Sequence, residues 1–400
     1  MAFWRPLDEA ASHAYNGAGN WGQSPRFEPW AKEVRMPRAK ITRREFVRDT
    51  AVATAAVATA AKMARAAEPD KSKILNYNEN MLYRRCGKTN LMVSAVCLGG
   101  HWKRINEVVK NAFQGGNWLA VDPKNPDFLA NRTEIVSRCI DVGINYIDAC
   151  THKETLAYSH ALKGRRDKMY LGYSWYEHEM RNGQFRTTEA LLKSLDEGMK
   201  LCGLDYVDLW RITLHERSSQ HTDAEIEQMA KALETAKKQG KARFTGFSSH
   251  DRPHIKKIIE TYPSVVDAIV TPYTAKTKEA PQDSLFDALR KHDVGFFGIK
   301  PFASGSLFKA GGAPAGPEAE EDDRRARLAI RYILCNPVIT APIPGMITTH
   351  QVDNVALAVK ESKEKKELTR AEIRELQAAM DDAWACLPED YQWLKDWEVV

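Results

Sequence analysis

Residues Gly143–Trp175, GINYIDACTHKETLAYSHALKGRRDKMYLGYSW, contain two short apolar runs separated by a polar loop and a helical stretch. The runs NYIDAC (145–150) and KMYLGYS (168–174) are continuous rather than alternating, which is typical of strands buried on both faces of a parallel sheet. This stretch therefore predicts a strand, a loop, a helix and a second parallel strand.

The same alternation of strands and helices continues along the chain. Further strands are predicted at 94–100, 205–213, 242–250, 266–273, 294–302 and 338–345. Apolar residues at helical spacing predict helices at Thr187–Leu201, Thr222–Gln239, Pro253–Glu260, Gln282–Lys291 and Ala319–Leu334. Eight strand–helix units predict an α/β fold, a single-domain (β/α)8 TIM barrel over residues 81–380, with an aromatic C-terminal tail (381–400) packed on it. An open doubly wound sheet is the alternative, but no G-x-G-x-x-G follows the first strand.

Composition excludes several classes of protein. The net charge is +5 and the basic residues are dispersed, so we expect no nucleic-acid partner. No run of about 20 apolar residues predicts a transmembrane segment in the mature protein. The seven cysteines show no C-x-x-C spacing, which argues against a zinc knot, an iron–sulfur cluster or a disulfide framework. No spacing of residues identifies a metal-ligand set.

Residues 36–67 have the order of features found in a twin-arginine signal peptide. Arg43 and Arg44 precede a weakly apolar run of Ala, Val and Thr, and a small-x-small pattern ends near Ala66. We therefore expect the twin-arginine machinery to export the protein to a periplasmic or other extracytoplasmic location. Residues 1–35 are expected to be an unstructured extension or a mis-assigned start, because Met36 would begin an ordinary signal.

Several phrases resemble one enzyme family in their order and spacing. They include LYRRCGKTNLMVSAVCLGG (82–100), GINYIDA (143–149), LDYVDLW (204–210), GFSSH (246–250) and GIKPFASGSL (298–307). Together they resemble the aldo/keto reductase family over residues 81–380. The resemblance implies a (β/α)8 barrel that binds NADP(H) across its mouth and reduces aldehydes and ketones with an Asp, Tyr, Lys and His tetrad. It implies an NAD(P)(H)-linked oxidoreductase acting on a small carbonyl or sugar-like substrate.

The tetrad is only partly present. Asp148 matches the aspartate of the family. Ser174 stands where the lysine is expected, and Thr213 stands where the histidine is expected. The loop that would carry the tyrosine contains none before Tyr158, which lies in the following helix. The resemblance therefore implies an altered catalytic set.

Other residues must then perform the acid chemistry. A tyrosine with a pKa of about 10 is a poor acid near neutral pH unless a neighbouring ammonium lowers its pKa. His152, in the loop after the second strand, and His215, two residues beyond Thr213, are the predicted groups for proton transfer and carbonyl orientation.

The cofactor segments resemble the family more closely. The resemblance assigns the nicotinamide amide to Ser248 and Ser249. It assigns the pyrophosphate to Lys300, Phe302, Ser304, Gly305 and Leu307, and the adenosine ribose to Gly345, Thr348, Gln351 and Asn354. No Arg or Lys stands at 348–350 to grip a 2′-phosphate, so NADP(H) and NAD(H) both stay open as cofactors.

Two other functional classes remain as alternatives. Five histidines lie just past predicted strand ends, near several carboxylates: His101, His152, His178, His215 and His250. Imidazoles and carboxylates around one barrel mouth suit a divalent metal, and so a metal-assisted sugar-modifying barrel of the isomerase or lyase type. A ligand-binding barrel without turnover is the third interpretation.

Overall fold

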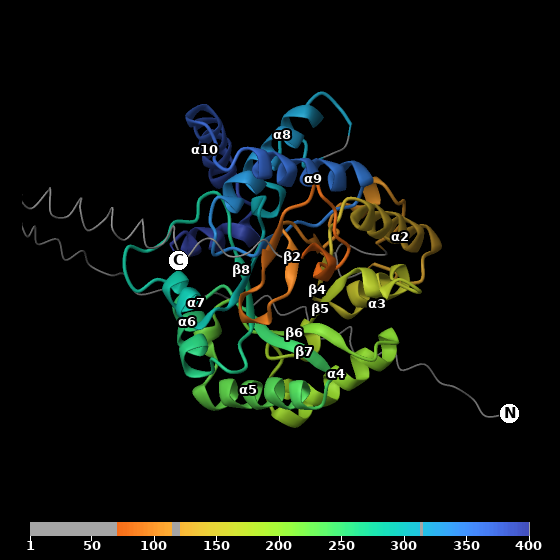
Figure 1. Ribbon diagram of the computed structural model, residues 1–400, viewed down its shortest axis with the longest axis vertical. Helices are drawn as coiled ribbons and strands as arrows, with labels where there is room; N and C mark the ends of the chain where they lie inside the picture. Colours follow the sequence, from red (N-terminus) through yellow and green to blue (C-terminus); the bar gives the residue numbers. More distant parts are fainter. Residues whose placement is uncertain (1–69, 114–120, 313–314, 400) are drawn as a thin grey trace, which may run out of the picture. The chain divides into compact units, whose positions relative to one another are not determined.

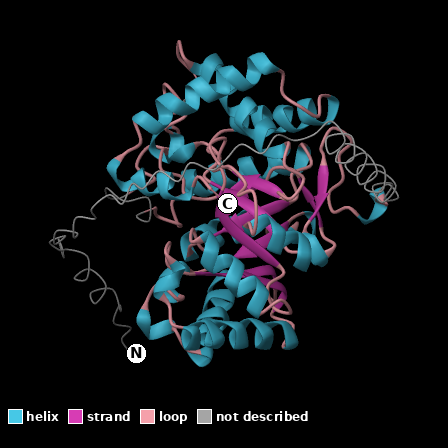
Figure 2. Cartoon of the chain, turned by 90° about the vertical axis from the view of Figure 1, so that its left-hand side faces the viewer, coloured by secondary structure: helices cyan, strands magenta, loops and turns pink. Residues whose placement is uncertain are grey.

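The computed structural model describes residues 70–113, 121–312 and 315–399, so the predicted extension and signal peptide lie outside the described residues. Eight parallel strands form one sheet in chain order, inside a ring of helices (Figures 1 and 2). The strands are β3 (Leu98–Gly99), β4 (Tyr146–Ala149), β5 (Tyr170–Tyr173), β6 (Val207–Thr213), β7 (Ala242–Ser248), β8 (Ala268–Pro272), β9 (Gly295–Ile299) and β10 (Ala341–Ile343). The predicted (β/α)8 fold is confirmed.

The barrel closes between its first and last strands. The Cys97 N–H donates to the Pro342 carbonyl at 3.0 Å, and the Gly99 N–H donates to the Pro344 carbonyl at 2.9 Å. A Cβ atom on Gly345 would lie 2.6 Å from the carbonyl oxygen of Gly100. Position 345, predicted to contact the cofactor, therefore needs a glycine because the first and last strands approach closely there.

The helices follow the strands as the sequence predicts. They are α2 (Pro126–Asp141), α3 (His152–Ala161), α4 (Thr188–Cys202), α5 (Asp223–Lys238), α6 (Arg252–Thr261), α7 (Leu285–His292), α8 (Ala319–Leu334), α9 (Thr349–Glu364) and α10 (Arg370–Ala385). Local signals set their ends: Thr222 and Glu225 form a capping box that starts α5, and Gly203 ends α4 with φ of 64°. No helix among the described residues is long and apolar enough to cross a membrane.

A hairpin seals the end of the barrel where the strands begin. Its strands, β1 (Tyr83–Arg85) and β2 (Met92–Ser94), pair antiparallel. Cys86 and Val93 pack in one buried cluster with side chains from the barrel interior, among them Phe297. The opposite end, where the strands finish, is left for chemistry, as in other barrels of this type.

The end of the chain crosses that opposite end. We call residues 389–399 the C-terminal strap; its first part is the 3₁₀ helix η10 (Glu389–Trp397). The strap is tied to the loop after β6 by an Arg217–Asp396 ion pair of 2.6 Å. It is tied beyond β7 and β8 by hydrogen bonds from Arg252 to the Val399 carbonyl (3.0 Å) and from the Lys278 N–H to the Glu398 carbonyl (2.6 Å).

Candidate active site

A buried ion pair lies at the ends of β4 and β6. Arg211 donates from Nε to Asp148 Oδ1 at 2.8 Å and from Nη2 to Oδ2 at 2.5 Å, with both side chains at most 5% exposed. Burial disfavours the charged guanidinium, but Asp148 outweighs it and raises the pKa of Arg211. Asp148 thus keeps a buried cationic partner although position 174 holds no lysine. The sequence could have indicated a role for Arg211, because a cation within the apolar strand VDLWRIT needs a buried anionic partner.

The positions expected to carry lysine and histidine belong to a second buried network. The hydroxyls of Ser174 and Thr213 lie 2.8 Å apart. Both residues bond to Glu179 Oε2, Ser174 through its hydroxyl at 2.5 Å and Thr213 through its N–H at 2.7 Å. Burial raises the pKa of Glu179 despite these hydrogen bonds. Arg211 Nη1 also donates to Thr213 Oγ1 at 3.2 Å, which joins this network to the ion pair, and no sequence pattern identified Glu179.

A third group lies at the ends of β3 and β4. Cys150 Sγ is 3.5 Å from His101 Nδ1, and that nitrogen is 3.3 Å from Glu154 Oε1. The Glu154 carboxylate also accepts the backbone N–H groups of His101 (2.6 Å) and Cys150 (2.7 Å). Burial would raise the pKa of Glu154, but His101 and these N–H donors lower it. His101 has a φ of 59°, in the left-handed region that non-glycine residues seldom adopt.

His152 and His215 lie apart from Asp148. His152 stacks on Trp175 with ring centroids 4.7 Å apart, in the helical layer. Arg186 Nη2 donates a 3.0 Å hydrogen bond to His215 Nε2. Burial first, and then neighbouring cationic groups, lower the pKa of both imidazoles, so both favour the neutral form. The structure does not bring the three predicted catalytic side chains together, and their roles stay predictions.

A phenol of the C-terminal strap lies near two ammonium groups. Lys103 Nζ donates to the Tyr391 hydroxyl at 2.5 Å, and Lys300 Nζ lies 5.7 Å from the centre of the Tyr391 ring. Burial alone would raise the pKa of Tyr391, but Lys300 and Lys103 lower it. Lys103 follows β3 and Lys300 follows β9, so this group lies at the catalytic end of the barrel. No sequence pattern identified Tyr391 as a site residue, because its partner is 288 residues away.

The predicted nicotinamide segment ends β7. Ser248 is the last residue of that strand and is buried. The Ser249 hydroxyl donates to the carbonyls of His215 (3.3 Å) and Glu216 (3.1 Å), so it orders the loop after β6. The next residue, His250, stacks on Trp393 of the strap with ring centroids 4.3 Å apart.

The predicted pyrophosphate segment has an unusual backbone. Lys300 has a φ of 58°, and the turn Ala303–Gly305 has three consecutive positive φ values of 47°, 60° and 92°. The N–H groups of Ala303 and Gly305 donate within the segment, to the carbonyls of Lys300 (2.9 Å) and Phe302 (2.8 Å). Phe302 packs on Phe308, and Leu307 is buried. Lys300 therefore supplies the cation that suits a phosphate, and Phe302 and Leu307 have packing roles.

The predicted adenosine clamp connects α9 to α8. Thr348 caps α9 by accepting the Gln351 N–H at 3.2 Å, and Gln351 Nε2 donates to the Gly312 carbonyl at 2.9 Å. Arg327 Nη1 on α8 donates to Asn354 Oδ1 at 2.6 Å. A guanidinium, missed from the sequence, therefore stands beside the clamp.

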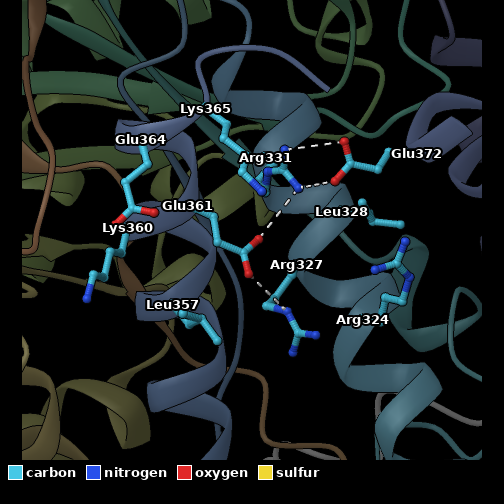
Figure 3. Close-up of a pocket in the computed structure, with 10 residues that line it drawn as sticks. All are labelled: Arg324, Arg327, Leu328, Arg331, Leu357, Lys360, Glu361, Glu364, Lys365 and Glu372. Atoms are coloured by element: carbon cyan, nitrogen blue, oxygen red, sulfur yellow. Dashed lines mark hydrogen bonds and ion pairs between the residues drawn. The ribbon is translucent and has the colours of Figure 1, made fainter. Parts of the chain in front are cut away.

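A hollow on the outer helical layer contains the same arginine. Figure 3 shows Arg324, Arg327 and Arg331 of α8 facing Glu361 of α9 and Glu372 of α10. Arg331 Nη1 lies 2.6 Å from Glu372 Oε1 and 3.5 Å from Glu361 Oε2. These ion pairs lie outside the barrel mouth and join α8, α9 and α10.

Comparison with known proteins agrees with this architecture. The aldo/keto reductase family model matches residues 115–378, more than half of the chain. The chain belongs to the aldo/keto reductase family. This confirms the resemblance seen in the sequence.

The relatives are distant. The chain is 27% identical to L-galactose dehydrogenase of Arabidopsis thaliana over 191 residues, which cover 44% of this chain and 59% of that protein. It is 28% identical to L-glyceraldehyde 3-phosphate reductase of Escherichia coli (strain K12) over 244 residues, which cover 57% of this chain and 63% of that one. The chain thus spans about three fifths of the length of these relatives.

Solved structures share the fold. An aldo-keto reductase from Bacillus halodurans in its holo form has a TM-score of 0.54 at 21% identity, covering 78% of this chain and 99% of that one. An aldo/keto reductase from Klebsiella pneumoniae in complex with NADP and acetate has a TM-score of 0.53 at 16% identity, covering 74% and 94%. At these identities the likeness shows the fold alone.

Proposed function

We propose that this protein is an exported oxidoreductase that uses NADP(H) or NAD(H) on a small carbonyl or sugar-like substrate, with a rebuilt catalytic set. Membership of the family supports the reaction class. The observation that carries the proposal is the Tyr391 phenol held against Lys103 and near Lys300, at the barrel end that also buries Asp148 and Arg211.

This arrangement would provide a proton donor and the cations that stabilise its deprotonated form, as the family tetrad requires. Bound NAD(P)H would supply a hydride to the carbonyl carbon. Tyr391 would donate a proton to the carbonyl oxygen, because two ammonium groups stabilise the phenolate that the transfer leaves behind. Lys103 would return a proton to Tyr391 from solvent, since it is exposed and hydrogen-bonded to the phenol. Arg211 would stabilise negative charge near Asp148 in place of the missing lysine.

The residues present fit a nicotinamide dinucleotide. Lys300 suits the pyrophosphate, and Arg327 beside Asn354 suits a ribose phosphate. Ser248 ends β7, where the nicotinamide is expected, and Thr348 and Gln351 lie at the start of α9, where the adenosine ribose is expected.

The first test is a titration of the full chain with NADPH and with NADH, followed by quenching of its tryptophan fluorescence. Trp393 lies on the strap beside the predicted nicotinamide segment and is the expected reporter. Saturable binding with Kd below about 10 μM, which corresponds to about 7 kcal/mol, is expected for at least one of them. Absence of saturable binding to both would overturn the proposed function.

Export is tested separately. The segment 36–67 fused to a reporter protein should direct it out of the cytoplasm of a cell with a twin-arginine translocase. Replacing Arg43 and Arg44 by lysine should keep the reporter inside, because the machinery reads the arginine pair. A reporter that stays inside with the intact segment, or leaves with the lysine pair, would contradict the prediction.

A further inference from the structure

We propose that His101, Cys150 and Glu154 bind one divalent transition-metal ion of the zinc type at the rim of the barrel mouth. The inference goes beyond the proposed function and does not depend on it, because it involves none of the residues assigned to the nucleotide. Within residues 70–113, 121–312 and 315–399, these three offer an imidazole nitrogen, a sulfur and a carboxylate oxygen that all lie within 4.8 Å of one another.

The separations suit a tetrahedral ion. Zinc bonds of about 2.1 Å to nitrogen or oxygen and about 2.3 Å to sulfur place neighbouring ligand atoms roughly 3.4–3.7 Å apart. In the structure, Cys150 Sγ is 3.5 Å from His101 Nδ1 and 3.6 Å from Nε2. His101 Nδ1 is 3.3 Å from Glu154 Oε1. The third separation, between the Cys150 sulfur and a Glu154 oxygen, is at most 4.8 Å, so an ion that binds all three would draw these two atoms together.

The backbone holds the ligands before any ion arrives. The Glu154 oxygens accept the N–H groups of His101 and Cys150, and each oxygen keeps a second lone-pair direction for a metal. Gly100 makes this possible, because a Cβ atom there would lie 2.1 Å from the Glu154 carboxylate. The left-handed backbone of His101 is the kind of strain that proteins retain at functional sites.

The charges also balance. Binding exchanges the thiol proton of Cys150 for the ion and releases that proton to solvent, so the thiolate and the Glu154 carboxylate together offset the two positive charges. The Glu154 side chain is only 3% exposed, and a neutral metal site there avoids the cost of an uncompensated charge. This donor set of sulfur, nitrogen and oxygen suits zinc or cobalt better than magnesium or calcium.

Three protein ligands leave one coordination position open. His101 has 41% of its side chain exposed, so the open position faces solvent at the mouth of the barrel. Water or an oxygen of a sugar-like substrate would take that place, and the ion would polarise a carbonyl as a Lewis acid. The other rim histidines have different neighbours: His178 stacks on Trp175, and His250 stacks on Trp393.

Cobalt binding tests the site directly. The full chain is stripped with a chelator, dialysed and titrated with Co²⁺, and the thiolate-to-cobalt charge-transfer absorption is followed. We expect one ion per chain with a thiolate band. Cys150→Ser should abolish the band, and His101→Gln should weaken binding by more than the about 10–100-fold that loss of an outer-shell partner costs.

The control removes the exposed thiols. The double variant Cys335→Ser/Cys386→Ser should keep the band and the stoichiometry, because both cysteines are exposed and lie outside the cluster. Cys150→Ser keeps the backbone N–H that bonds to Glu154, so circular dichroism should show an intact fold. No cobalt binding, binding without a thiolate band, or a band that survives Cys150→Ser would overturn the proposal.

Discussion

The centre and the rim of the barrel mouth use charged groups in opposite ways. At the centre, every charge is enclosed and held by its neighbours: Arg211 satisfies Asp148, and hydroxyl and N–H donors satisfy Glu179. At the rim, His101 and Lys103 are exposed, and they contact the buried carboxylate of Glu154 and the half-buried phenol of Tyr391. The difference favours the proposed location of the chemistry, in the loops and the strap around the strand ends.

Removing the central cation should have the largest effect. Arg211→Met leaves Asp148 buried without its partner, and this should lower the free energy of unfolding by about 3–5 kcal/mol. Urea denaturation measures the loss. Asp148→Asn added to the same chain should recover much of it, because the buried charge is then gone.

A matched surface pair calibrates that result. Arg138→Met breaks an ion pair with Asp353 in which the side chains are 41% and 47% exposed, and should cost about 0–1 kcal/mol. If Arg211→Met lowers the free energy of unfolding no more than Arg138→Met does, the Asp148–Arg211 pair is not enclosed as described above.

Glu177, in the 3₁₀ helix Tyr176–His178 after β5, should make stability depend on pH. Burial raises its pKa from 4.5 to about 7, with Glu154 and Glu179 adding to the shift. The folded state therefore holds the proton more tightly, so stability should fall as pH rises from about 4.5 to about 7, by about 3 kcal/mol in total. Urea denaturation at several pH values should show this fall in the native chain and its absence in Glu177→Gln.

A surface carboxylate provides the comparison for that profile. Glu189→Gln, in the exposed first turn of α4, should leave the pH profile unchanged. A profile that Glu177→Gln does not flatten would show that another group controls it.

Tyr391→Phe tests whether the rim, rather than the centre, supplies the catalytic acid. It removes the proposed acid and should lower kcat for aldehyde reduction by about a hundredfold, with little change in Kd for the nucleotide. Steady-state kinetics with a small aldehyde and the better-bound nucleotide give both numbers. Tyr206→Phe, at an exposed site on the opposite face, should be silent. Equal kcat in the two variants would remove Tyr391 from the mechanism.

The smallest expected effect concerns the choice of nucleotide. Arg327→Ala should weaken NADPH binding about tenfold, or about 1.4 kcal/mol, and leave NADH unchanged, because only NADPH carries the 2′-phosphate. Arg324→Ala, in the same outer hollow but paired with Glu375, is the control. Equal losses for both nucleotides would exclude Arg327 from phosphate recognition.

The sequence predicted the architecture well because its signals are local. Continuous apolar runs identified all eight barrel strands, and helical spacing identified α4 to α8 close to their observed ends.

The site was less predictable because its contacts are distant in sequence. Arg211 bonds to Asp148 across 63 positions, and its meaning depends on which way the strand faces. Tyr391 was placed in a packing tail, and only the fold brings it to Lys103. The dispersed histidines suggested a metal, but Cys150 was missing from that set because a lone cysteine carries no spacing signal.

The C-terminal strap also bears on how long a nucleotide would stay. The strap is fastened beyond β6, β7 and β8 and covers His250, directly after the predicted nicotinamide segment. If the proposed nucleotide lies beneath the strap, it would leave only when these contacts open together, and its release would be slower than from an open groove. Such a nucleotide would exchange slowly between turnovers. An exported enzyme of this kind would regenerate its hydride from a second substrate in the same barrel, without a pool of free nucleotide outside the cytoplasm.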